Sequence, residues 1–264
     1  MRVSPPLLVS CFASALWVGA VAGCAPADAP APVDLEDGGL DGGADAGPQT
    51  EDAAIDRALK FAFPIHPDDR HHIHPTLIFG VDHDPAMGTR SQCRNYDDQP
   101  FPLCYDGHDG SDFVLADGFA QMDRESARVV AAAAGEVYGV FDSNYDRCHG
   151  DWSTGDISCD GNPVRANYVR VRHANGWVSW YYHLKRNTAV VAVGDAVDCG
   201  EVLGLVGSSG RSYLPHLHFE VKDDAGSTVD PFGGALTDGV SHWMEQEGPD
   251  RLPGPSCHPL WQTP

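Results

Sequence analysis

The chain has 264 residues, and its 38 Asp and Glu residues outnumber its 17 Lys and Arg residues, which gives a formal net charge of −21. This negative charge argues against nucleic acids and other anionic polymers as partners, and we interpret it as keeping an exported protein soluble. Beyond the N-terminal segments, roughly 200 residues remain, which suits a single domain with a sizeable core.

The N-terminus has the features of a secretory signal. Met1 and Arg2 precede a largely apolar run, residues 7–22, which is shorter than the roughly 20 apolar residues of a membrane-spanning helix. The run leads into the sequence Val-Ala-Gly-Cys, ending at Cys24, which resembles a bacterial lipobox. The resemblance implies removal of residues 1–23 and a lipid anchor at Cys24. The protein would then be exported and held on a bacterial membrane, the outer membrane facing the periplasm in a two-membrane cell. The alternative is an ordinary signal peptide with an incidental Cys24.

A low-complexity segment follows the signal. Residues 24–58 are rich in Ala, Pro, Gly and Asp and bury too little apolar surface to offset the entropy of ordering, so we expect a flexible tether. We place one folded domain at residues 59–235 and a C-terminal tail, packed on the domain, at residues 236–264. A monomer is expected.

Cysteine usage agrees with export. Setting aside Cys11 in the signal and Cys24 leaves an even set, which in an exported chain predicts disulfides: Cys93, Cys104, Cys148, Cys159, Cys199 and Cys257. Proximity favours Cys93–Cys104 and Cys148–Cys159, and Cys199–Cys257 would then attach the tail, although six cysteines allow other pairings. The sequence contains no Cys-x-x-Cys pair, which argues against a cysteine zinc cluster.

The domain shows mainly strand patterns. Residues 168–172 and 177–182 alternate around Asn175-Gly176, the strongest short signal for a hairpin. Further short strands are expected at residues 190–193, 202–206 and 217–221. Residues 123–134 could hold a turn or two of helix, with a strand in the later half. The pattern predicts a mostly β domain with an antiparallel sheet.

Two long polar insertions, residues 84–105 and 142–162, interrupt the strands. Each carries one of the proposed disulfides, Cys93–Cys104 and Cys148–Cys159, so both insertions are expected to be ordered.

The chemistry-bearing residues lie in three short motifs, which contain His108 and Asp112, then His183, then His216 and His218. His and Asp are suitable metal ligands, and catalytic zinc sites use three protein ligands and leave one position open. In the last motif, strand alternation places His216 and His218 on one face and the apolar residues between them on the other. Glu220 shares the histidine face and could orient a ligand, but a solvated glutamate is expected.

Five blocks in order resemble the lysostaphin-like (LytM-type) zinc endopeptidases of bacterial cell walls. The family pattern is His-x-Gly-x-Asp, then Ala-x-x-x-Gly-x-Val, then His-Leu after a strand, then a glycine-rich Gly-x-x-Val run, then His-Leu-His-Phe-Glu. The corresponding residues here are 108–112, 131–137, 183–184, 194–210 and 216–220. The Phe79-Gly80 pair resembles the family's entry strand, but the path from it to His108 is longer than usual. The resemblance covers roughly residues 63–232.

The resemblance implies a fold, a cofactor and residue roles. The fold would be the duplicated hybrid motif, an antiparallel sheet lining a groove, here with two disulfide-bearing loop insertions. His108, Asp112 and His218 match the ligands of one zinc ion, and His183 and His216 match the two flanking catalytic histidines. The activity would be hydrolysis of peptide bonds in peptidoglycan stem or cross-bridge peptides. The insertion at residues 142–162 falls where a groove wall is expected, so the substrate does not transfer from the family.

Two alternative functions stay open. The first is a non-catalytic LytM-like regulator of other wall hydrolases, against which the presence of all five site residues argues. The second is a zinc endopeptidase acting on exported or foreign proteins. Two further metal sites are disfavoured: a calcium loop at residues 142–146, which lacks the usual glycine and glutamate, and a second histidine-rich site around residues 66–83.

Overall fold

The computed structural model describes residues 59–152, 154–246 and 251–257. The predicted signal peptide, the lipid anchor at Cys24 and the tether lie outside these residues and stay predictions. Among the described residues, no helix is long and apolar enough to cross a membrane.

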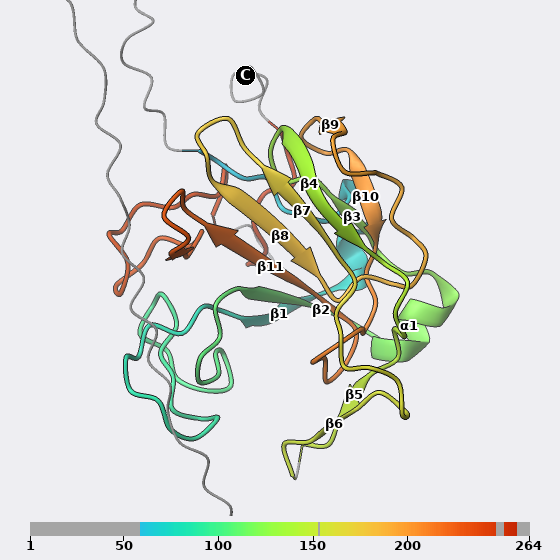
Figure 1. Cartoon of the computed structure of the whole chain (residues 1–264). Coiled ribbons are helices and arrows are strands. Elements are labelled where there is room, and N and C mark those ends of the chain that lie inside the picture. Colours follow the sequence, from blue (N-terminus) through green and yellow to red (C-terminus); the bar gives the residue numbers. More distant parts are fainter. Residues whose placement is uncertain (1–58, 153, 247–250, 258–264) are drawn as a thin grey trace, which may run out of the picture. The chain divides into compact units, whose positions relative to one another are not determined.

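An antiparallel sheet dominates the domain, as predicted (Figure 1). Its strands lie in the order β1-β2-β11-β8-β7-β4-β9, and β12 pairs with the free part of β11. Their bounds are β1 Ile73–Phe79, β2 Ser111–Leu115, β4 Gly135–Phe141, β7 Tyr168–Arg172, β8 Val178–Tyr182, β9 Ala196–Val197, β11 His216–Lys222 and β12 Thr228–Val229. The central strand β11 therefore comes late in the chain and inserts between β2 and β8, which brings distant motifs together.

The predicted hairpin is present as β7 and β8, paired from Tyr168 opposite Tyr182 to Arg172 opposite Val178. Gly176 adopts a φ of +87° in the turn, a conformation that the missing side chain makes accessible. The alternation predicted for the last motif is confirmed on β11, where Leu217, Phe219 and Val221 are buried in the core.

The core lies on one face of this sheet. Buried side chains from β2, β7, β8 and β11 pack against the segment before β1 and against Trp243 and Leu252 of the C-terminal region. Phe61, for example, makes edge contacts with Phe219 and forms a bridge to Trp243. Because the apolar residues alternate, the opposite face carries the polar side chains of the same strands.

Smaller elements complete the domain. They are a 3-10 helix at Pro67–His72, α1 at Gly118–Arg124, β3 at Arg128–Val130 paired with β10 at Val202–Leu205, and β5 at His149–Gly150 paired with β6 at Ile157–Ser158. The helix starts earlier than the expected 123–134 segment and ends where Glu125 becomes extended, and the strand expected in the later half is β3.

The strand expected at residues 190–193 does not form. Val190 makes one ladder-like bond, to the Leu203 carbonyl, but the Ala192 amide bonds instead to the side chain of Asp195. The chain turns at Gly194, whose φ is +95°, and Val190 and Val193 are exposed. The apolar run therefore makes a single ladder-like bond, and of its three valines only Val191 packs against the core.

All three proposed disulfides are present: Cys93–Cys104, Cys148–Cys159 and Cys199–Cys257. The first two close the two polar insertions, which the structure describes except at residue 153. The third connects the segment before β10 to Cys257, beyond the buried Trp243 and Leu252.

Candidate metal centre

Three side chains predicted as ligands converge on the polar face of the sheet. Asp112 on β2 and His218 on β11 are direct cross-strand neighbours, and His108 lies in the turn that leads into β2. Asp112 Oδ1 is 2.8 Å from His218 Nδ1 and 3.1 Å from His108 Nε2, and the two histidine nitrogens are 3.1 Å apart. All three residues are buried. One donor atom from each therefore faces a common point.

Gly110, between the predicted ligands His108 and Asp112, has a steric role. A Cβ at Gly110 would lie 2.6 Å from two ring atoms of His218 and 2.8 Å from the Phe219 carbonyl oxygen. No side chain fits there without displacing the ring. The spacing His-x-Gly-x-Asp thus lets β2 carry Asp112 while the turn before it passes against His218.

A hydrogen bond at His108 and a carboxylate contact at His218 occupy the far side of each ring and indicate which nitrogen faces the centre. His108 Nδ1 donates to the Gly80 carbonyl at 2.7 Å, which leaves Nε2 for the centre. His218 Nε2 lies 3.7 Å from the Glu220 carboxylate, which leaves Nδ1 for the centre. Glu220 is 3% exposed and pairs with Lys222, so the expectation of a solvated glutamate was wrong. The burial follows from the strand ladder, where Glu220 lies opposite Trp180.

The electrostatics of the cluster follow from packing a carboxylate among imidazoles. Burial alone would raise the pKa of Asp112, but the neighbouring His108 and His216 outweigh it and hold the pKa well below its usual value. Burial likewise opposes a charged His218, but the hydrogen bond to Asp112 and the negative charges of Asp112 and Glu220 raise the pKa of His218 to about 10. The site thus keeps Asp112 ionised and favours positive charge beside it.

These donors fit a zinc ion. Two imidazole nitrogens and a carboxylate are suitable zinc ligands, and three protein ligands with an open position are typical of catalytic sites. The ligand atoms of His108, Asp112 and His218 all lie within 4.8 Å of one another. The hydrogen bond from His108 to the Gly80 carbonyl is of the kind that orients metal-bound histidines.

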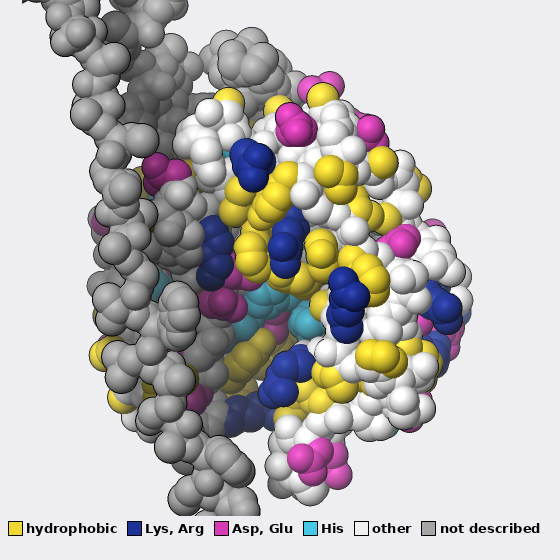
Figure 2. Space-filling model, viewed as in Figure 1, with side chains coloured by type: hydrophobic (Ala, Val, Ile, Leu, Met, Phe, Trp, Pro, Cys, Tyr) yellow, Lys and Arg dark blue, Asp and Glu magenta, His cyan; other side chains and the backbone are white. Residues whose placement is uncertain are grey.

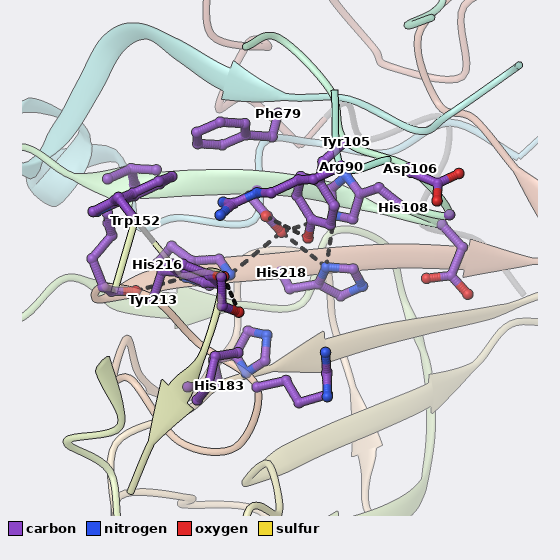
Figure 3. A pocket seen from close by; sticks show the side chains of 18 residues that line it. Phe79, Arg90, Tyr105, Asp106, His108, Trp152, His183, Tyr213, His216 and His218 are labelled. Carbon is purple, nitrogen blue, oxygen red and sulfur yellow. Dashed lines mark hydrogen bonds and ion pairs between the residues drawn. The ribbon is translucent and has the colours of Figure 1, made fainter. Parts of the chain in front are cut away.

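The two histidines predicted to flank the metal lie beside this cluster (Figure 3). His216 Nε2 is 3.4 Å from Asp112 Oδ1, and its Nδ1 is held by the Leu214 carbonyl at 2.8 Å. The ring of His183, at the end of β8, is 4.6 Å from that of His216 and 5.8 Å from that of His218. The structure therefore brings all five predicted residues together.

His183 is held in an unusual way. Its φ is +63°, in the left-handed region that non-glycine residues rarely adopt and that often marks functional sites. Its Nδ1 donates to the Ser209 carbonyl at 2.6 Å, which leaves Nε2 free to accept a proton. Burial, reinforced by His216 and His218, holds the pKa of His183 well below its usual value. The imidazole is therefore neutral at pH 7.

One residue at the centre was missed by the sequence analysis. Tyr105, at the end of the first insertion, donates its hydroxyl to Asp112 Oδ2 at 3.1 Å and stacks on His108 with ring centres 4.1 Å apart. Burial and the adjacent Asp112 raise the pKa of Tyr105 well above its usual value, so the phenol stays protonated and donates. Proximity in the chain, three residues before His108, was the only available signal.

Replacing Tyr105 with phenylalanine is expected to weaken metal binding by about 10- to 100-fold, because residues that hydrogen-bond a ligand typically contribute this much. The ring and its stacking on His108 are retained, so the change isolates the bond to Asp112. The measurement is zinc affinity by competition with a chromophoric chelator. Tyr145→Phe, in the second insertion, is the control, because its hydroxyl bonds to Asp160 away from the centre. Equal zinc affinity in the Tyr105→Phe variant and the unsubstituted protein would contradict this role.

The five residues form the floor of a cavity of about 570 Å³. Figure 2 shows histidine side chains gathered in a hollow with basic side chains at its margins. Both insertions contribute to the walls: Arg90 and Tyr105 come from the first, and Trp152, Gly155 and Ile157 from the second. The second insertion is therefore a groove wall, as expected from its place in the chain.

The disfavoured metal sites do not assemble in the described part of the chain. Only two groups there bring three His, Cys, Asp or Glu ligand atoms within 4.8 Å, the predicted centre and a second group formed by Asp109, His218 and Glu220. Lys222 contacts both carboxylates of that second group and supplies its positive charge. In the 142–146 segment, side-chain oxygens of Asp142 and Asp146 accept the backbone N–H groups of Ala189 and Arg186.

Comparison with known proteins agrees with this geometry. Residues 107–231 match the sequence profile described as Peptidase family M23. A stretch of 72 residues is 38% identical to the peptidoglycan DD-endopeptidase ShyC of Vibrio cholerae, covering 26% of this chain and 16% of that protein. A stretch of 70 residues is 46% identical to the DD-carboxypeptidase/endopeptidase Mpg of Neisseria meningitidis, covering 26% of this chain and 15% of that protein. The chain thus matches less than a fifth of the length of these two relatives.

Among solved structures, the catalytic domain of the antimicrobial peptidase lysostaphin from Staphylococcus simulans is similar, with 26% sequence identity and a TM-score of 0.33. The match covers 48% of this chain and 77% of that structure.

Proposed function

We propose that this chain, whose residues 107–231 form a domain of peptidase family M23, is a zinc endopeptidase that hydrolyses peptide bonds in peptidoglycan stem or cross-bridge peptides. The observation that carries the proposal is the convergence of His108, Asp112 and His218 on the floor of a cavity, with two further histidines beside them. A regulator that only binds other hydrolases has no need for such an arrangement.

Zinc held by these three residues would acidify a bound water and polarise the scissile carbonyl. His183 Nε2 is the proposed proton acceptor, because the Ser209 carbonyl fixes the other nitrogen as a donor and burial keeps the ring neutral. The same nitrogen would pass the proton to the leaving amine. His216 Nε2 is the proposed donor to the oxyanion that develops on the substrate. The Leu214 carbonyl takes the Nδ1 proton of His216, so Nε2 would act as a donor in the doubly protonated ring, which lies 3.4 Å from the Asp112 carboxylate.

The proposal includes the compartment. Three disulfides form and persist in an oxidising environment, which supports export. A tethered position on the membrane, through lipid at Cys24, would place the domain next to the wall. A single chain carries the whole centre, so the proposed active form is a monomer.

Purified peptidoglycan is the direct test. We expect the zinc-loaded protein to convert cross-linked muropeptides into smaller fragments with new free amines, detected by liquid chromatography and mass spectrometry. Chelation of the metal should stop the conversion and added zinc should restore it.

The two alternative functions predict different results. A glycine-rich protein and an unstructured protein are digested in parallel, and their cleavage without wall cleavage would favour a peptidase of exported or foreign proteins. If neither the wall nor the proteins are cleaved, and the chain stimulates a second wall hydrolase, the result would favour the regulator and contradict the proposal.

A further inference from the structure

A cationic cluster lies at the wall of the cavity, formed by the two insertions and the loop before β11. The guanidinium carbon of Arg90 is 4.6 Å from the ring centre of Trp152 and 4.1 Å from that of Tyr213. The two rings are themselves 4.9 Å apart at an angle of 47°, so the guanidinium lies over both. Figure 3 shows Arg90 extended toward Trp152 above the histidines. Arg90 also lines the cavity, so the cation is available to a ligand there.

No carboxylate of the described residues pairs with this cation. Arg124, Arg128 and Arg147 each form an ion pair with an aspartate, whereas Arg90 and Arg211, both lining the cavity, form none within the part of the chain that the structure covers. The two guanidinium groups on the cavity are therefore not neutralised by an ion pair with a described carboxylate. A guanidinium presents a fork of N–H donors that matches a carboxylate.

Two disulfides and the packing of Tyr213 position the residues of the cluster. The Cys93–Cys104 and Cys148–Cys159 disulfides close the insertions that carry Arg90 and Trp152. The Tyr213 hydroxyl donates to the Gly155 carbonyl at 2.5 Å, and a Cβ at Gly150 would lie 1.9 Å from the Tyr213 ring, so the ring packs directly on β5. Donors fixed before binding lose less entropy when a ligand arrives.

We propose that Arg90 and Arg211 form a subsite for a carboxylate of the substrate peptide. The inference rests on the proposed function and narrows it to wall peptides that carry a free carboxylate near the scissile bond, in preference to amidated or uncharged bridge peptides. The Trp152 and Tyr213 rings hold Arg90 in place and present apolar surface to the rest of the peptide.

The test uses two pools of cross-linked muropeptides, one native and one with its carboxylates amidated by carbodiimide and ammonia. Cleavage of the native pool should exceed cleavage of the amidated pool by about 10- to 100-fold in kcat/KM, the effect of a charge-assisted hydrogen bond. In Arg90→Gln and in Arg211→Gln, the ratio of kcat/KM for the native pool to kcat/KM for the amidated pool should fall toward one. Arg94→Gln is the matched control, because Arg94 lies in the same insertion, is exposed and does not line the cavity.

Each outcome decides the inference. Equal cleavage of both pools by the unsubstituted protein would overturn the subsite and leave the proposed function standing. Retention of the preference in both Arg90→Gln and Arg211→Gln would also overturn the subsite. If neither pool is cut, the proposed function fails, and calorimetric binding of the two pools decides the subsite separately. Arg211 is exposed, so Arg211→Gln should leave the fold intact. If the native pool binds more tightly than the amidated pool, and Arg211→Gln removes this difference, the carboxylate subsite is supported. Equal binding of the two pools, or no binding of either, would refute the subsite.

Discussion

Replacing His218 with alanine is expected to abolish zinc binding. The Nδ1 of His218 is one of three donors that face the centre, and it lies 2.8 Å from Asp112 and 3.1 Å from His108. Its loss leaves two ligands, and a catalytic zinc site needs three from the protein. The metal content, measured by mass spectrometry of the purified protein, should fall from about one zinc per chain to near zero. Peptidoglycan cleavage should disappear with it.

An isosteric change separates metal binding from packing. Asp112→Asn keeps the shape of a buried side chain but removes the negative charge, and it should also reduce zinc affinity by more than the about 10- to 100-fold expected for Tyr105→Phe. His71→Ala is the control, because His71 is exposed in the histidine-rich segment before β1. Full zinc content in the His218→Ala variant, or loss of zinc in His71→Ala, would show that the metal is held elsewhere.

Replacing either flanking histidine should instead abolish turnover and leave zinc in place. Loss of a proton carrier typically lowers the rate by about 10² to 10⁴. His183 and His216 lie beside the three ligands, with ring centres 4.6 Å apart, and neither belongs to the set of three converging donors. Zinc content, circular dichroism and muropeptide cleavage are measured on the same preparations of His183→Ala and His216→Ala.

A second variant at His183 is needed to separate the loss of the imidazole from strain in the backbone. Its φ of +63° disfavours alanine, whereas asparagine tolerates the left-handed region. His183→Asn should therefore fold without added strain and still lose cleavage, which separates the loss of the imidazole from a backbone effect. Full activity of His183→Asn or His216→Ala would refute the assigned role, and zinc loss in His216→Ala would mean that His216 is a ligand.

The pH dependence of peptidoglycan cleavage should reflect the protonation of His183. Burial lowers the pKa of His183 from 6.5, so the neutral, proton-accepting form persists below that pH. The acid limb of kcat/KM, where activity falls as His183 becomes protonated, should therefore lie below pH 6.5. An acid limb above pH 6.5 in the unsubstituted protein would contradict His183 as the proton acceptor.

Much of the candidate centre could be predicted from the sequence because its residues lie in short, regular motifs. Alternation on one strand placed His216 and His218 on the same face, and this required no knowledge of the neighbouring strands. The disulfide pairs Cys93–Cys104 and Cys148–Cys159 followed from proximity, since a short loop keeps its ends close whatever the fold. The five blocks, taken in order, indicated the family before the strand order was known.

Two expectations drawn from local sequence patterns were wrong. The apolar run at residues 190–193 resembles a strand, but a strand forms only where a partner supplies its ladder, and here the chain turns instead. Glu220 has the composition of a surface residue, but its position on the central strand, opposite Trp180, buries it behind His218. The burial of Glu220 depends on a strand distant in the chain, whereas the turn that ends the 190–193 run is made by the adjacent Gly194 and Asp195.

The sequence by itself therefore determined the residues of the candidate centre, their spacing and the strand faces that carry them. Only the tertiary structure decided which other side chains meet them. Tyr105 on Asp112, and Arg90 beside Trp152 and Tyr213, join segments separated by insertions with no periodic pattern. The path of such loops is set by contacts and disulfides made after the sheet has formed, because their own residues favour no single conformation.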